Sequence, residues 1–129
     1  MKIYLTPYLK IKDIKRNFEN FFPYLKLEFF KQKQEPGHEA TQRDILPNSS
    51  FLIDATGMLK AQEIEITSRQ TVAEVEQLFE TLLNLPIQIY RKTRYSWVET
   101  IPTEDMTLEK QDKLGRKLCN AIYDDELIW

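Results

Sequence analysis

Several residue types that mark secreted or metal-binding proteins are scarce in this chain. Its 129 residues include one cysteine, so no internal disulfide forms and nothing indicates an oxidising compartment. The single histidine, His38, leaves no set of His and Cys residues at the spacing of a zinc site, and we expect no cofactor. Three glycines are too few for a linker-rich chain. We therefore expect one globular domain covering residues 1–129.

Long apolar runs are also missing. No stretch approaches the roughly 18 apolar residues of a membrane span. The N-terminal sequence MKIYLTPYLKIKDIK lacks the uninterrupted apolar segment of a signal peptide. The sequence therefore predicts a cytoplasmic protein that has no membrane partner.

A strong excess of one charge is absent as well, although the total of −2 hides an asymmetry. Residues 1–62 hold ten Lys or Arg against seven Asp or Glu, whereas residues 63–129 hold eight against thirteen, so the halves carry +3 and −5. This asymmetry favours head-to-tail contacts or a weak anionic ligand near the first half. It falls short of a dedicated nucleic-acid surface.

The most informative feature that is present is an internal repeat. Apolar residues near the N-terminus recur 61 positions later with the same spacing, in the pairs Ile3 and Ile64, Leu5 and Ile66, Ile11 and Val72, Ile14 and Val75, Phe18 and Phe79, Phe21 and Leu82, and Phe22 and Leu83. With one residue dropped, the match continues with Leu25 and Leu85, Leu27 and Ile87, and Phe29 and Ile89. The repeat units cover about 2–31 and 63–91.

Each repeat unit has the pattern of a strand, a helix and a second strand. Apolar and polar residues alternate at the start and end of each unit, which is typical of half-buried strands. Between them, apolar residues at steps of three and four form one helical stripe. Two such units in tandem fit a four-stranded antiparallel sheet with both helices on one face. The sequence thus predicts an α+β fold, a ferredoxin-like two-layer sandwich.

One alternative fold is a ubiquitin-like β-grasp. The segment TVAEVEQLFETLLNLP resembles the helix region of such domains, and EIEI before it resembles their second strand. A β-grasp begins with a hairpin, however, where this chain has another strand-helix pair. We therefore favour the ferredoxin-like fold.

The remaining segments are predicted as additions to the two units. Residues 86–100 have the pattern of a hairpin, and a last helix with Thr107 as its N-cap follows Pro102. The segment 40–46 is the suggested counterpart of this helix in the first unit. Residues 51–54 suggest a short strand before a turn at Gly57.

Residues that could carry catalysis are few. Asp54 ends an apolar segment, and His38 and Arg43 lie in the irregular stretch before it, so these three are candidates for a pocket between the repeats. They form no pattern of nucleophile and base. Cys119 lies in an amphipathic segment and has the setting of a structural thiol. A small enzyme or ligand-binding domain is therefore an alternative, and we favour a non-catalytic protein.

The predicted hairpin is the best candidate for a binding surface. It combines positive charge with aromatic rings, and the segment DDELIW adds one more tryptophan; the candidate residues are Tyr90, Arg91, Lys92, Arg94, Tyr95, Trp97 and Trp129. Such surfaces bind single-stranded nucleic acid, but Glu63 and Glu65 on the predicted sheet would repel phosphates. We therefore predict a protein-interaction module that binds a protein partner or itself, for example as a homodimer. Weak nucleic-acid binding is the second alternative.

Overall fold

Strands and helices alternate along the chain in the computed structural model, which describes residues 1–31 and 45–120. In order, the elements are β1 (Lys2–Leu5), α1 (Ile11–Phe21), β2 (Leu25–Phe29), α2 (Leu52–Thr56), β3 (Gln62–Glu65), α3 (Val72–Leu83), β4 (Ile87–Lys92), β5 (Trp97–Glu99), the 3-10 turn η2 (Ile101–Thr103) and α4 (Leu108–Cys119). The predicted α+β class is confirmed, including the hairpin and the last helix. None of the helices in these residues has the length and apolar character needed to cross a bilayer.

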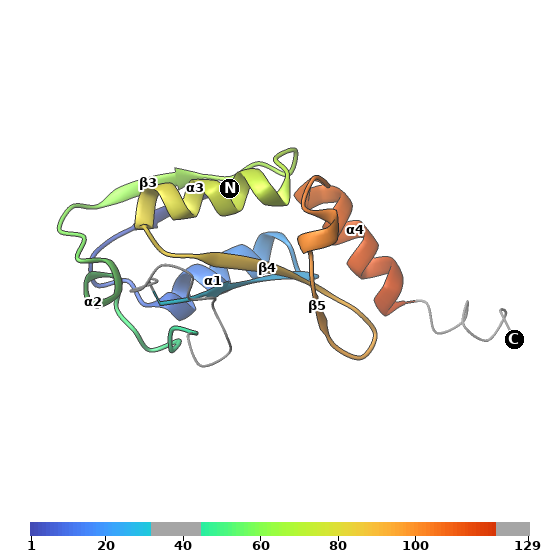
Figure 1. Cartoon of the computed structure of the whole chain (residues 1–129), viewed down its shortest axis with the longest axis horizontal. Coiled ribbons are helices and arrows are strands. Elements are labelled where there is room, and N and C mark those ends of the chain that lie inside the picture. Colours follow the sequence, from blue (N-terminus) through green and yellow to red (C-terminus); the bar gives the residue numbers. More distant parts are fainter. Residues whose placement is uncertain (32–44, 121–129) are drawn as a thin grey trace, which may run out of the picture.

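The strands pair as two antiparallel sheets. One contains β1 and β3, and the other has the order β2-β4-β5. In Figure 1, β2 and β4 run through the middle of the molecule, and α4 lies near β5 at one end. The pairing of β1 with β3 agrees with a ferredoxin-like sheet, but β2 pairs with β4 instead of lying at the opposite edge. The ferredoxin-like strand order is therefore not confirmed. Because α1 directly follows β1, the chain does not begin with the hairpin of a β-grasp.

One hydrophobic core joins both repeat units. The inward residues of β1, β2, β3 and β4 and the apolar stripes of α1 and α3 belong to a single buried cluster, which also includes Leu46, Leu52 and Leu108. Phe29 and Phe79 meet edge to face in this core, with ring centroids 5.7 Å apart. Phe21 differs from the prediction, because its side chain is 60 % exposed. It lies beside the buried stripe of Ile11, Ile14 and Phe18 and not within it.

The strand registers relate the two units in a simple way. Ile3 pairs with Ile64, and these two residues are equivalent positions of the repeat. Glu28 pairs with Gln88 in the second sheet, and these are equivalent as well. Both registers are consistent with a two-fold rotation that exchanges the units.

The starts of α1 and α3 are held by the same backbone pattern. Amides of the first turn of each helix donate to a loop later in the chain, the one just before α2 or α4, in the bonds Ile11 to Ser50, Lys12 to Asn48, Val72 to Met106 and Ala73 to Glu104, at 2.9–3.0 Å. The helices that follow these loops are also bound alike: Leu52 N donates to Leu9 O and Leu108 N to Gln70 O, both at 2.9 Å. We therefore propose that the repeat extends further than predicted, with α2 and α4 as counterparts.

One prediction for the segment before β3 is wrong. The residues predicted as a strand, 51–54, mostly form α2, which ends at Gly57 with a left-handed φ of 73° that glycine adopts readily. The predicted counterpart of α4, the segment 40–46, lies mostly outside the described residues, and its residue Ile45 forms an antiparallel bridge with Phe30.

Candidate functional site

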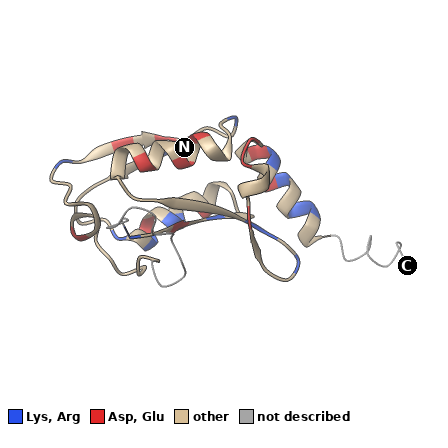
Figure 2. Cartoon of the chain, viewed as in Figure 1, with Lys and Arg blue, Asp and Glu red and all other residues tan. Residues whose placement is uncertain are grey.

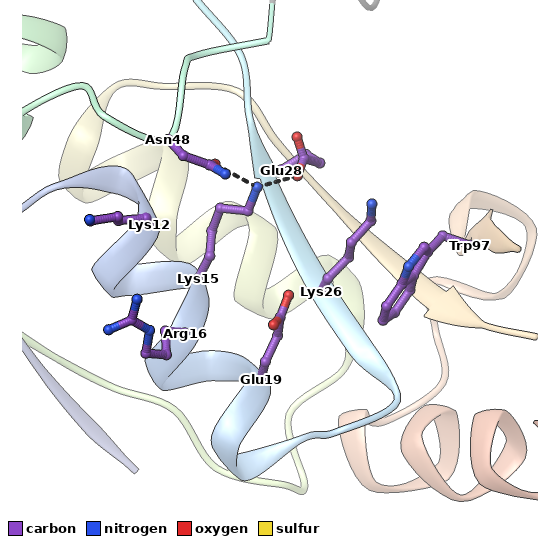
Figure 3. Close-up of a pocket in the computed structure, with 8 residues that line it drawn as sticks. All are labelled: Lys12, Lys15, Arg16, Glu19, Lys26, Glu28, Asn48 and Trp97. Atoms are coloured by element: carbon purple, nitrogen blue, oxygen red, sulfur yellow. Dashed lines mark hydrogen bonds and ion pairs between the residues drawn. The ribbon is translucent and has the colours of Figure 1, made fainter.

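A groove lined with basic residues lies between α1 and the outer face of β2 (Figure 3). Its volume is about 340 Å³, and its lining residues are Lys12, Lys15, Arg16, Glu19, Lys26, Glu28, Asn48 and Trp97. Four of these eight side chains are cationic and two are carboxylates, so the groove carries net positive charge. We call this surface the basic groove.

Helix α1 forms one wall of the basic groove because it is amphipathic. Its apolar residues Ile11, Ile14 and Phe18 are buried against the core, which fixes the direction of the other faces. The residues at steps of three and four beside this stripe are Lys12, Lys15, Arg16 and Glu19, so they share one face. The start of the helix is fixed by Asp13, whose carboxylate accepts a hydrogen bond from the Lys10 amide at 3.1 Å.

Lys15 joins the two walls of the groove. Its Nζ makes an ion pair with Glu28 on β2 and donates a hydrogen bond to Asn48 Oδ1 at 2.9 Å (Figure 3). Glu28 is therefore neutralised locally. Within residues 1–31 and 45–120, Lys12 and Arg16 take part in no ion pair, and both side chains are exposed. These two cations are available to an anionic group of a ligand.

Lys26 is held at the other end of the groove by two aromatic rings. Its Nζ lies 5.1 Å from the ring centroid of Trp97 and 5.4 Å from that of Tyr90. Strand register explains this contact, because Lys26 pairs with Tyr90 on β4, and β5 brings Trp97 alongside. Cation–π contacts of this kind contribute about 0.5–1 kcal/mol at exposed sites. Partial burial, with the charges of Glu99 and Glu28, raises the pKa of the Tyr90 phenol, which therefore remains neutral.

The predicted interaction residues lie in different parts of the molecule. Tyr90, Lys92 and Trp97 lie on the outer face of the sheet with Lys26, and the Lys92 Nζ is 6.0 Å from the Trp97 ring. Arg94 and Tyr95 lie at the hairpin tip, where the guanidinium is 4.9 Å from the ring centroid. Trp129 lies outside the described residues.

Arg91, also predicted as an interaction residue, points toward α4 and away from the basic groove. Its Nη1 donates to Gln111 Oε1 at 2.7 Å, and the fully buried Gln111 donates in turn to the backbone and side-chain oxygens of Thr103, both at 2.8 Å. Asp112 accepts from the Tyr24 amide at 2.9 Å, and burial raises the pKa of this carboxyl. Arg91 thus helps to attach α4 to the sheet.

The candidates for catalysis are not brought together in the described residues. Asp54 is exposed on α2 and does not line the groove, while His38 and Arg43 lie outside the described part. Cys119 is a half-buried free thiol at the end of α4. Across residues 1–31 and 45–120, no cluster of three His, Cys, Asp or Glu side chains is placed to hold a metal ion.

The sequence interpretation missed Lys12, Lys15, Arg16 and Lys26, although a signal for them exists. At the equivalent positions of the second unit stand Ala73, Glu76, Gln77 and Pro86. The two units therefore agree in their buried residues and differ in charge on this face. A comparison of the polar positions of the repeat, in addition to the apolar ones, would have pointed to α1.

No protein-family model, no curated protein and no solved structure matches this chain. The geometry and charge of the basic groove are therefore the features that indicate a function.

Proposed function

We propose that this chain is a non-catalytic binding module whose basic groove takes an acidic segment of a partner protein. The observation that carries this proposal is the gathering of four cationic side chains from α1 and β2 around one hollow, beside Trp97. Carboxylates of a partner gain electrostatic attraction there, and tryptophan is a frequent anchor of protein interfaces.

The carboxylates of the groove favour a protein over a nucleic acid. Glu19 lies among the cations, and Glu99 lies beside Tyr90 on the same sheet. A continuous phosphate backbone would meet these negative charges, whereas an acidic peptide can place its few carboxylates beside Lys12 and Arg16. The Lys26 ammonium group also lies over the Trp97 ring, so less of the ring surface is open for stacking with a base.

A peptide-binding experiment tests the proposal. The probe is a fluorescent peptide of about ten alternating Asp and Glu residues, measured by anisotropy at low salt. The triple variant Lys12→Ala, Arg16→Ala and Lys26→Ala should bind roughly 3- to 100-fold more weakly, because each exposed ion pair contributes about 0.2–1 kcal/mol. Lys110→Ala, Lys113→Ala and Lys117→Ala on α4 remove the same charge outside the groove and should retain most of the affinity.

Two outcomes would overturn the proposal. If both triple variants lose affinity equally, the attraction depends on net charge alone and not on the groove. If an oligothymidine of about ten nucleotides binds more tightly than the peptide at the same salt concentration, the nucleic-acid alternative is favoured.

The role of the aromatic ring can be tested separately. Trp97→Ala should weaken peptide binding by roughly fivefold, a change of about 1 kcal/mol, since it removes the ring as an anchor and the cation–π contact that positions Lys26 in the groove. Tyr95→Ala is the matched control, because Tyr95 is an aromatic residue of the same hairpin that lies outside the groove. Equal losses in the two variants would contradict a specific role for Trp97.

A further inference from the structure

The second repeat unit carries an acidic surface where the first unit carries the basic groove. Helix α3 contains three glutamates and no lysine or arginine, and the loop before α4 adds two carboxylates. Figure 2 shows the acidic residues of α3 in red. This surface comprises Glu74, Glu76, Glu80, Glu104 and Asp105. We call it the acidic surface.

The acidic surface is a continuous feature of the fold. The Ala73 amide donates to the Glu104 carbonyl at 2.9 Å, so the loop lies against the first turn of α3. The charges of Glu104 in this loop and of Glu80 on α3 both act on Glu76. Glu74, Glu80, Glu104 and Asp105 are exposed to solvent.

The basic groove and the acidic surface cannot meet within one chain. They lie on different helices of one packed core, at positions that the strand registers relate by a two-fold rotation. The attraction between them can be satisfied only between molecules. Because the two surfaces differ, such a contact leaves one basic and one acidic surface exposed at the ends of each pair.

We propose that the acidic surface of a second copy of this chain occupies the basic groove, which gives head-to-tail self-association. This inference rests on the proposed function, because it names the partner of the same groove. The opposite charges of the two halves, +3 and −5, add a long-range attraction in the same direction. The association depends on charge and is weakened by salt, since the screening length falls from about 10 Å at 0.1 M to about 3 Å at 1 M.

Sedimentation velocity of the full chain tests the inference. At low salt, the average mass should rise with concentration from the 15.4 kDa monomer to more than two copies, and it should return to the monomer near about 0.5 M salt. A monomer at every concentration would overturn the inference. If that monomer still binds the acidic peptide, the proposed function stands and only the choice of partner is wrong.

Two variants locate the contact. The double variant Lys12→Ala and Arg16→Ala removes two cations of the basic groove. The double variant Glu74→Gln and Glu80→Gln removes two charges of the acidic surface. Glutamine at position 74 can still accept the capping hydrogen bond from the Thr71 amide. Each variant alone should remain monomeric. An equimolar mixture should form pairs that stop at two copies, because only one groove and one acidic surface remain to meet.

The controls are variants that change the same charge elsewhere. Glu63→Gln with Glu65→Gln on the exposed side of β3, and Lys110→Ala with Lys117→Ala on α4, should associate as the unmodified chain does. Loss of association in these controls, or a mixture that stays monomeric, would overturn the inference.

Discussion

Glu76 makes the stability of this protein depend on pH. Its carboxylate accepts a hydrogen bond from the Ile89 amide at 3.0 Å, at a point of β4 that β5 does not cover. The Thr100 hydroxyl donates to the Ile89 carbonyl at 2.7 Å. The side chains of Glu76 and Thr100 thus bind the backbone groups of Ile89 that β5 leaves unpaired. Burial, opposed in part by the Ile89 hydrogen bond, raises the pKa of Glu76 from 4.5 to about 7, and the charges of Glu104 and Glu80 act in the same direction as burial.

The raised pKa fixes the direction of the effect. Between pH 4.5 and about 7, the folded state binds the proton of Glu76 more tightly than the unfolded state does. The free energy of unfolding therefore falls as pH rises through this window, and the loss is complete above it. One pKa unit corresponds to about 1.4 kcal/mol, which gives about 3 kcal/mol in all. Because the carboxyl is partly exposed to solvent, we reduce this to about 1–2 kcal/mol.

The substitution Glu76→Gln tests this reasoning. Glutamine cannot ionise, and its carbonyl oxygen can still accept the bond from Ile89. Urea unfolding should show nearly equal stability for the two proteins at about pH 4, and a variant that is about 1–2 kcal/mol more stable at about pH 8. The comparison cancels the titration of all other groups. A difference that does not change with pH, or a variant that is less stable at the higher pH, would refute the reasoning.

Two further substitutions test the packing. Gly115→Ala should lower the melting temperature, because the added Cβ would lie 2.8 Å from the Tyr24 Cβ, and overpacking of about 1–3 kcal/mol exceeds the helix-propensity gain of about 1 kcal/mol. A higher melting temperature would show that α4 does not approach the sheet this closely. Phe18→Ala and Phe79→Ala should each cost about 3–5 kcal/mol in urea unfolding, since both side chains are fully buried at equivalent positions. Costs that differ by more than about 2 kcal/mol would argue against equivalent environments.

The regular elements were predictable where the apolar pattern is long. Helices α1 and α3 and the strands beside them follow from residues that recur with periods of 3.6 and 2, and their inward positions are buried as expected, apart from Phe21. The last helix was predictable as well, because Thr107 caps it by accepting from the Lys110 amide.

The features that escaped prediction depend on few residues or on distant contacts. Helix α2 has five residues and buries only Leu52, so it shows no helical period. The pairing of β2 with β4 was not predicted, because a tandem pattern of strands fits more than one set of partners. The basic groove joins residues 12–19, 26–28, 48 and 97, which no local motif connects. Its helical part was nevertheless visible in the difference between the two repeat units.

If the basic groove is the binding surface of this protein, a bound ligand changes the surroundings of its lining residues. Titration of the isotope-labelled chain with the acidic peptide, followed by NMR, detects such changes residue by residue. Chemical-shift changes should be concentrated in the amides of α1, in Lys26 and Glu28, and in the indole of Trp97. Shift changes that spare these groups and concentrate on α3 or α4 would contradict this role of the groove.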